Sequence, residues 1–387
     1  MDQIKKFYIT EFLKTQNYFI PVMILFLQFN KLNYTQIFTL YSIQSAAVFL
    51  LEIPSGILAD RIGKKPALLV SRVSLIPAYF IFAFLSGFLW FLFAMIFLAV
   101  NKAFKSGTHK AFIFDYLKYS GSEVTPTEVY GKCKFWARIG EAIASVAGGV
   151  IAVKYGYETV FLAALIPVIL NIFNTVSYAD IEGKIGIRIP GLREQFIHIK
   201  NSAMEIYGKK NMLKLILNSA LFIFCIEASE KFLQPYMVSA KIKVEYFGVI
   251  YMIFMLITAF ASRYSYTLEK HFKRYSIINS LGIFAIIPFI FFWIGIVEKW
   301  GIVFFLMIFL LKNLRRPILT TALNENISSS NRATILSITA LAKSVFLMLF
   351  LPVIGYISDN FSMTGAFIVI GLLALINGIV FKIDNTP

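Results

Sequence analysis

The sequence has 387 residues, of which 58% are apolar and 15% are charged, and its mean hydropathy is +0.73. About a quarter of the residues of an ordinary soluble domain are charged. This composition therefore excludes an ordinary soluble domain. It predicts a helical membrane protein, because β-barrel strands would appear as short alternating segments. The formal net charge of +16 falls mainly in every second predicted loop, as expected for cytoplasmic loops, and does not indicate nucleic-acid binding.

The apolar stretches predict twelve membrane spans with short loops. A span needs about 20 apolar residues. In chain order we expect spans at residues 7–29, 36–59, 67–86, 88–116, 130–153, 159–179, 212–239, 246–267, 276–297, 301–323, 333–356 and 361–381. No small-residue cleavage site follows the first stretch, so we expect that span to be retained.

The longest polar stretch divides the chain. It predicts a cytoplasmic linker at residues 181–211 between a six-helix bundle at 1–180 and another at 212–387, with both chain ends in the cytoplasm. Phe196, Ile197 and Ile199 give this linker a possible interfacial helical face. The two halves repeat weakly at an offset of 206 residues, which places Gly148-Gly149 on Ile354-Gly355.

The connection between the second and third spans is a basic turn, Gly56-Ile-Leu-Ala-Asp-Arg-Ile-Gly-Lys-Lys65, here called the 2–3 turn. Gly56 removes a side chain where two helices could approach closely, and Gly63 permits a tight backbone. The three basic residues of the turn hold it on the cytoplasmic side. Asp60 is suited to facing the N-terminus of another helix, where free N–H groups and the helix dipole attract a carboxylate.

This turn resembles the 2–3 loop of the major facilitator superfamily of secondary transporters, which reads G-x-L-A-D-R-x-G-R-K. Lys64 stands for the arginine, and the matched residues are Gly56, Leu58, Asp60, Arg61, Gly63, Lys64 and Lys65. The resemblance implies an all-α polytopic fold of twelve transmembrane helices in two pseudo-symmetric six-helix bundles. It also implies that Asp60 meets the start of the eleventh helix near Arg332-Ala333-Thr334, a contact that would lock one conformation. The alternative is a loop that only sets topology.

Three further runs resemble a bacterial branch of this superfamily, whose members are mostly efflux proteins. They are Glu52-Ile-Pro-Ser-Gly56, Ser106-Gly-Thr108 with Asp115, and Asn324-Glu325 with Arg332-Ala-Thr-Ile-Leu-Ser337. In the fifth span, Gly140, Gly148 and Gly149 match the glycine pattern of antiporters, although Ala144 and Ser145 replace its inner Gly-Pro. This favours export, with close helix packing as the alternative explanation.

Ionisable residues inside the predicted spans are the candidate site. Each costs about 2.5–3.5 kcal/mol at the centre of a span, so each should face a cavity or a partner. We predict Glu141, Glu227 and Glu230 as proton or cation sites, with Arg138 and Lys343 as counter-charges or anion contacts. Static ion pairs are the alternative. Basic residues that could attract an anionic group, or merely set topology, are Lys102, Lys105, Lys312, Arg315 and Arg316.

We therefore expect a transporter, not an enzyme, that exports a small organic or amphipathic solute by alternating access in exchange for protons. The alternatives are a proton- or ion-coupled symporter of an anionic metabolite and a lipid flippase or scramblase. Cys133 and Cys225 lie far apart and the three histidines are scattered, so we expect neither a metal nor another cofactor. The expected partners are the solute, protons and membrane lipids, and we expect a monomer in the bacterial cytoplasmic membrane, without nucleic acid.

Overall fold

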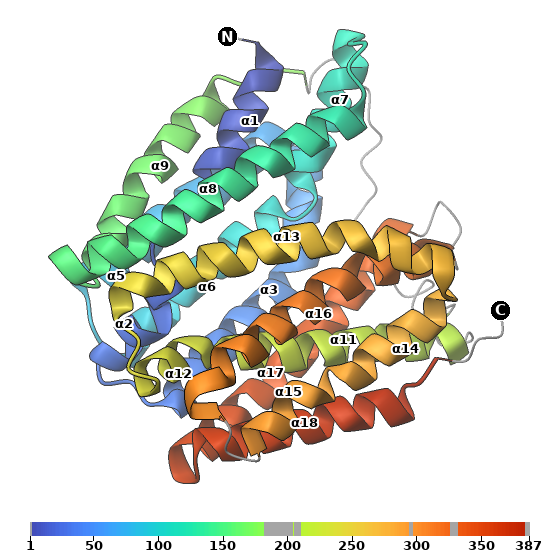
Figure 1. Ribbon diagram of the computed structural model, residues 1–387. Helices are drawn as coiled ribbons and strands as arrows, with labels where there is room; N and C mark the ends of the chain where they lie inside the picture. The colour runs from blue at the N-terminus through green and yellow to red at the C-terminus, as the bar shows by residue number, and fades with distance from the viewer. Residues whose placement is uncertain (1, 182–203, 205–209, 294–296, 326–331, 384–387) are drawn as a thin grey trace. The chain divides into compact units, whose positions relative to one another are not determined.

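A computed structural model describes residues 2–181, 204, 210–293, 297–325 and 332–383, and the regular elements in these ranges are helices (Figure 1). The predicted linker at 181–211, with Phe196, Ile197 and Ile199, lies mostly outside the described residues. The helices are α1 Gln3–Leu13, η1 Ile20–Val22, α2 Met23–Phe29, α3 Tyr34–Ile62, α4 Lys64–Val73, α5 Leu75–Phe84, α6 Phe88–Lys105, α7 Thr108–Ser120, α8 Pro126–Tyr155, α9 Thr159–Val176, α11 Lys210–Glu230, α12 Leu233–Ser239, η3 Val244–Tyr246, α13 Phe247–His271, α14 Arg274–Phe284, α15 Ile286–Trp293, α16 Val297–Glu325, α17 Arg332–Asn360 and α18 Met363–Val380.

The twelve predicted spans are confirmed as helical segments, several of them divided in two. Ten helical stretches of the described chain are long and apolar enough to cross a membrane. The tenth predicted span, α16, is outside this group because it carries several basic residues, and the first because it is broken into α1, η1 and α2. Large apolar side chains project from the spans, as lipid contact requires; Leu50 and Phe173 expose 68% and 67% of their surface.

The prediction of uninterrupted first and fourth spans is wrong. The first breaks after Leu13, and the carbonyl oxygen of Tyr18 in this break packs against Gly148 of α8. The fourth breaks at Gly107, whose φ of +73° is a left-handed conformation that glycine adopts without strain. Both breaks therefore depend on backbone geometry that a hydropathy profile does not contain.

The helices form two compact units. The first contains the described residues of Met1–Leu32, Ile43–Pro190 and Lys243–Met252, and the second those of Asn33–Ser42, Gly191–Ile242 and Ile253–Pro387. The start of α3 thus belongs with the second unit and the start of α13 with the first. These two helices each contribute residues to both units.

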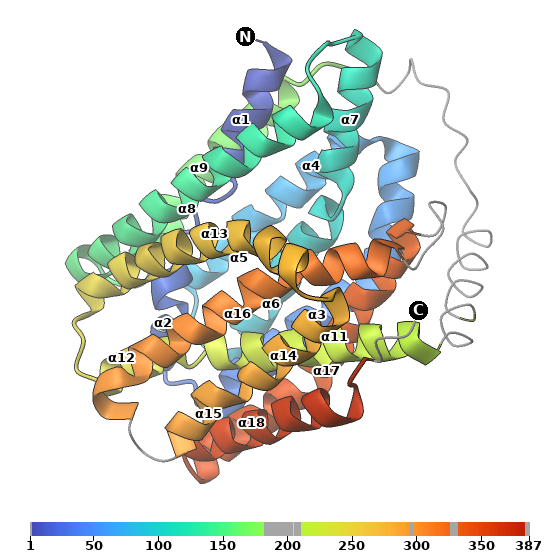
Figure 2. The same cartoon turned by 45° about the vertical axis from the view of Figure 1, so that its right-hand side comes forward.

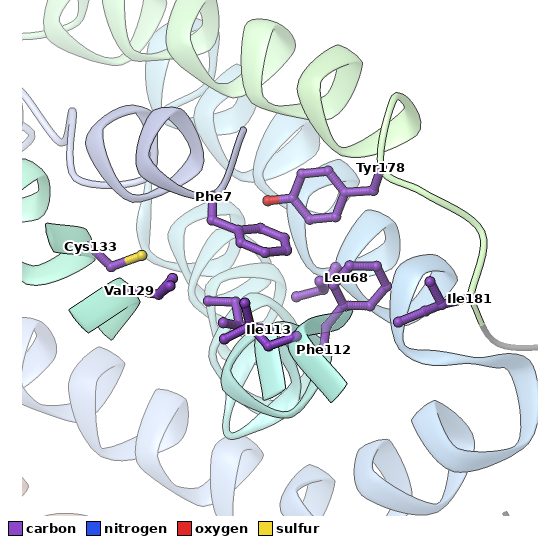
Figure 3. Packing of buried hydrophobic residues seen from close by; sticks show 9 residues of the cluster. Phe7, Leu68, Phe112, Ile113, Val129, Cys133, Tyr178 and Ile181 are labelled. Carbon is purple, nitrogen blue, oxygen red and sulfur yellow. The ribbon is translucent and has the colours of Figure 1, made fainter. Parts of the chain in front are cut away.

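An aromatic and aliphatic cluster closes one end of the first unit. It gathers side chains from α1, α4, α7, α8 and the segment after α9: Phe7, Leu68, Phe112, Ile113, Leu117, Val129, Cys133, Tyr178 and Ile181. Figure 3 shows the rings of Phe7 and Tyr178 side by side, and their centroids are 5.3 Å apart in an edge-to-face arrangement. Burying each large apolar side chain contributes about 1.5–3 kcal/mol, so this cluster fixes α1 against α7.

Phenylalanine rings hold the second unit together where α12, α15, α16 and α18 meet (Figure 2). The rings of Phe292 and Phe367 are stacked with centroids 4.0 Å apart, and Phe305 and Phe232 lie against Phe367. These contacts join α12, α15, α16 and α18 into one packed body. The second unit is therefore a helical bundle with an aromatic core.

In the first unit, glycines let α8 approach its neighbours closely. A side chain at Gly140 would meet the carbonyl oxygen of Phe12 at 2.7 Å, and one at Gly149 would meet the backbone of Glu245 and Gly248 at 3.3 Å. Gly148 lies against the Tyr18 backbone in the same way. Close packing is therefore one role of the glycines of the fifth span.

The start of α3 is bound to the end of α17 by a carboxylate. The two Asp359 oxygens accept the backbone N–H groups of Tyr34 and Thr35 at 2.9 and 2.7 Å, and the Thr35 hydroxyl donates to Oδ2 at 2.6 Å. A side chain at Gly355 would meet the Tyr34 carbonyl oxygen at 2.6 Å. At the 206-residue offset Gly355 corresponds to Gly149, so both halves use a glycine where two backbone segments approach closely. Asp359 corresponds to Val153, so the carboxylate is present only in the second half.

Candidate functional site

Two glutamates of α11 each form an ion pair with a lysine from another span. Both carboxylate oxygens of Glu230 accept hydrogen bonds from Lys312 Nζ of α16, at 2.8 and 2.9 Å. Glu227 Oε1 lies 3.3 Å from Lys343 Nζ of α17. Both pairs are partly buried, with side chains 20–31% exposed. The two charges of each sign balance, which lowers the cost of placing them inside spans.

Lys231 is the cation nearest to these glutamates along the sequence. Lys231 Nζ instead lies 3.4 Å from the centroid of the Tyr41 ring. The lysines that pair with the glutamates are 82 and 116 residues further along the chain. Lys312 also interacts electrostatically with Glu227, so the four side chains form one charged group. Its predicted role in proton coupling stays a prediction.

The pair predicted in the fifth span is local. Arg138 Nη1 donates to Glu141 Oε2 at 2.7 Å, three residues along α8, and 55% of the Arg138 side chain is exposed. An exposed pair of this kind contributes about 0–1 kcal/mol to stability. The geometry therefore fits a local ion pair, and a substrate role for either residue stays a prediction.

The 2–3 turn is anchored inside the first unit. Gly63 has φ +99°, which confirms that the turn needs glycine there, and it precedes α4 directly. Lys64 forms an ion pair with Asp115 of α7, and Lys65 donates to the Tyr178 carbonyl oxygen at 2.8 Å. The lysines therefore fix the turn to neighbouring segments in addition to any role in topology.

The other residues of the turn have few neighbours among the described residues. No atom of a neighbouring described segment lies within 4 Å of the position that a side-chain carbon at Gly56 would take, so a close helix approach at Gly56 stays a prediction. Asp60 and Arg61 are exposed. Helix α17 begins at Arg332 as predicted, although the Arg332 side chain lies outside the described residues. The contact of Asp60 with this helix start stays a prediction.

The branch motifs contact one another. The Ser106 hydroxyl donates to Glu52 Oε1 at 3.0 Å, which joins α3 to the break between α6 and α7. The ion pair of Lys64 with Asp115 joins the 2–3 turn to the motif residue Asp115 of α7. Motif residues that are 51 and 54 residues apart are therefore structural partners.

A buried polar network in the first unit is absent from the sequence predictions. His109 Nδ1 lies 2.9 Å from Glu11 Oε1, and His109 Nε2 lies 3.2 Å from the Tyr178 hydroxyl. That hydroxyl is 2.5 Å from Thr10 Oγ1, and Lys14 pairs with the same Glu11 oxygen. Glu11 and His109 are only 9% and 6% exposed. The network therefore ties α1 to α7 and to the segment after α9.

Basic residues surround this network. Arg72 of α4 is 7% exposed, and its guanidinium carbon lies 6.0 Å from the Tyr178 ring centroid. Lys105, at the end of α6, interacts electrostatically with Glu11, Lys14 and Arg72. The sequence signal for this group was weak, because Glu11 and Lys14 stand near the start of the chain and His109 follows 98 residues later. Glu11, Lys14 and His109 come together because the chain breaks at Gly107 and α7 packs against other helices of the first unit.

The fold and these charged groups define a polytopic helical membrane protein with ionisable pairs inside its spans, which is the architecture of a membrane transporter. A family model described as Major Facilitator Superfamily matches residues 14–313. The chain therefore belongs to the major facilitator superfamily.

Known relatives and structures agree with this assignment. The chain is 22% identical over 380 residues to an uncharacterized MFS-type transporter, YxaM, of Bacillus subtilis strain 168, covering 94% of this chain and 91% of that protein. The structure of a variant of the nucleoside transporter NupG aligns with a TM-score of 0.80 at 11% identity, covering 98% of this chain and 99% of that one. A POT family transporter in complex with 5-aminolevulinic acid aligns with a TM-score of 0.79 at 13% identity, covering 99% and 96%. At these identities the structures show the shared fold.

Proposed function

We propose that the protein is a secondary active transporter that exports a small organic solute in exchange for protons by alternating access. The observation that carries this proposal is the group of two glutamate–lysine pairs inside the spans of the second unit. Protonating a carboxylate that pairs with a lysine removes the charge attraction between the two side chains, which couples protonation to rearrangement of the helices that carry them. We place the protein in the bacterial cytoplasmic membrane with both chain ends in the cytoplasm.

We assign the two glutamates different roles on the basis of the distances to their lysines. Glu230 makes two hydrogen bonds to Lys312 at 2.8 and 2.9 Å, and Glu227 Oε1 lies 3.3 Å from Lys343 Nζ. The longer Glu227–Lys343 distance makes this the weaker charge-assisted interaction of the two. We therefore assign proton exchange to Glu227 and positioning of Lys312 to Glu230.

The direction of transport rests on a different feature. The glycines of the fifth span resemble those of antiporters, which favours export. Gly148 and Gly149 also pack against neighbouring backbone. The second candidate is a proton- or ion-coupled symporter of an anionic metabolite, which is favoured by the excess of cations around Glu11 in the first unit.

Inverted membrane vesicles test the coupling role. Compounds that stabilise the purified protein in a thermal-shift screen are added to energised vesicles that contain a dye sensitive to the pH gradient. Wild type should release protons from the vesicle lumen on addition of such a compound, and Glu227→Gln should not. Glu128→Gln, on the 49% exposed Glu128 of α8, is the control and should behave as wild type.

The double variant Glu227→Gln/Glu230→Gln gives the opposing outcome. Undiminished gradient-driven proton movement in the double variant would remove both glutamates from coupling. Movement of the compound out of the vesicle lumen together with the protons would favour the symporter, and gradient-independent movement of lipid would favour a flippase or scramblase.

A further inference from the structure

Arg315 of α16 is buried inside the second unit, with only 1% of its surface exposed. Its Nε donates to the carbonyl oxygen of Ile278 of α14 at 3.2 Å, and its Nη2 donates to the side-chain oxygen of Asn218 of α11. The guanidinium carbon lies 4.0 Å from the centroid of the Phe222 ring, which is also on α11. One planar side chain of α16 therefore contacts two neighbouring helices at once.

The acceptor on α11 is itself held in place. Asn218 Nδ2 donates to the carbonyl oxygen of Phe381, at the end of α18, at 2.9 Å. The segment after α18 is bound to α14, because Asn279 Nδ2 donates to the Ile383 carbonyl oxygen at 2.8 Å and Asn279 Oδ1 accepts from the Ile383 N–H at 3.1 Å. These polar contacts join α11, α14, α16 and α18 of the second unit (Figure 2).

Stability alone does not account for an arginine at this position. Both acceptors of Arg315 are neutral oxygen atoms, and among the described residues its Nη1 atom has no hydrogen-bond partner. Burying a cation that neutral groups hold is costly, and a long apolar residue in its place often costs less. An ionisable residue inside a span indicates a functional role. We therefore examine what Arg315 does for the charged group on the same helix.

Lys312 lies one helical turn before Arg315, and it binds a distant point of the same partner helix. Lys312 pairs with Glu230, whereas Arg315 binds Asn218, so α16 runs antiparallel to α11. The two residues of α11 are about 18 Å apart along their helix, and the two of α16 only about 4.5 Å. The two side chains must therefore reach in opposite directions, and the Lys312–Glu230 pair depends on where α16 lies along α11.

Pro317 increases this dependence. It lies inside α16 and has no N–H to bond the carbonyl oxygen of Asn313, so the helix can bend between these two residues. Arg315 lies within this weakened turn, and Lys312 directly precedes it. The contacts of Arg315 with α11 and α14 therefore fix the segment whose bending would displace Lys312.

We propose that Arg315 is a positioning residue for the proton-exchange site: it fixes α16 against α11 and α14 so that Lys312 stays paired with Glu230. This inference rests on the proposed function, in which Lys312 and Glu230 act together with Glu227. Arg315 acts through Lys312, which Glu230 holds from the other side. Loss of the Arg315 contacts should weaken the Lys312–Glu230 pair and favour the protonated form of Glu230.

Labelling with dicyclohexylcarbodiimide tests the proposal on the purified, full-length protein in detergent, because this reagent modifies protonated carboxyl groups in apolar surroundings. Tandem mass spectrometry distinguishes Glu230 from Glu227 in the same peptide. At neutral pH, Lys312→Gln should raise the labelling of Glu230 about tenfold or more, and Arg315→Gln about threefold or more. The double variant should label no more than Lys312→Gln alone, because Arg315 acts through Lys312.

Two controls separate positioning from loss of structure. Cys225 is buried in α11, and its reaction with maleimide should stay as slow in Arg315→Gln as in wild type. Lys273→Gln removes an exposed lysine of the second unit and should leave the labelling of Glu230 unchanged. Arg315→Lys keeps the charge but lacks the planar fork, so it should also raise labelling, and it keeps the test valid if Arg315→Gln does not fold.

Three outcomes would overturn the inference. They are unchanged labelling of Glu230 in Lys312→Gln or in both Arg315 variants, a double variant in which the two effects multiply, and a rise in labelling accompanied by an equal rise in the reaction of Cys225. The last would make Arg315 a structural residue only. Labelling requires no transport, so a failure of proton coupling in vesicles would refute the proposed function without deciding the role of Arg315.

Discussion

The carboxylate of Asp359 should hold the start of α3 on α17, and Asp359→Asn tests this directly. Asp359 accepts three hydrogen bonds, two of them from backbone N–H groups in the first turn of α3. Asparagine keeps one oxygen acceptor and loses the negative charge. Losing a capping interaction costs about 1 kcal/mol, and losing a charge at a helix N-terminus costs about 0.3–1 kcal/mol more.

The expected sum, about 1–2 kcal/mol, corresponds to an increase of about 5- to 30-fold in the population with α3 undocked. Hydrogen exchange followed by mass spectrometry on a peptide covering residues 33–42 measures it, because undocking releases the bonded N–H groups. Protection of this peptide should fall by that factor in Asp359→Asn. Other segments of α3 should change less.

Asn360→Ala is the matched control, since the Asn360 side chain donates to the Tyr356 carbonyl oxygen of its own helix and leaves the α3 contact intact. Equal protection of residues 33–42 in wild type and Asp359→Asn would refute the capping argument. Equal loss in both variants would attribute the effect to fraying of α17.

Two further changes test close packing and the 2–3 turn. Gly148→Ala places a methyl group onto the backbone carbonyl oxygen of Tyr18, in the break after α1, and should lower the unfolding midpoint by several degrees. Gly131→Ala is the control in the same helix; it has open space around it and should be neutral or stabilising. Equal unfolding midpoints in the two variants would show that the break adapts freely to the added methyl group. Asp60→Asn should slow turnover and change which membrane side labels a cysteine introduced into a span, with the two native cysteines, Cys133 and Cys225, buried and so poorly reactive. Identical labelling and rate would mean that the turn only sets topology.

Hydropathy located the spans because each must cover the apolar thickness of a membrane with internally bonded backbone. Residues 130–153 were expected for the fifth span, and α8 covers Pro126–Tyr155. The breaks were not foreseeable in this way. Gly107 takes a positive φ, and the Tyr18 carbonyl packs on a glycine 130 residues away, so both depend on tertiary contacts.

The candidate site was only partly accessible from sequence. Lys343 was expected as a counter-charge, and it does pair with Glu227. Lys312 was grouped with cations that could attract an anion or set topology, and it instead pairs with Glu230. Glu11 and His109 were passed over because a histidine and a glutamate 98 residues apart carry no local pattern. Charge pairing between distant spans is a property of helix packing, and one sequence contains little information on it.

Transport by purified protein in liposomes tests the central claim most directly. Compounds found by thermal shift are supplied under an imposed pH gradient, with the protein as the only component added to the lipid. We predict accumulation that depends on the gradient, stops when a protonophore collapses it and is absent in Glu227→Gln. Equal movement of the compound with and without the gradient, in wild type and variant alike, would contradict proton-coupled transport by this chain.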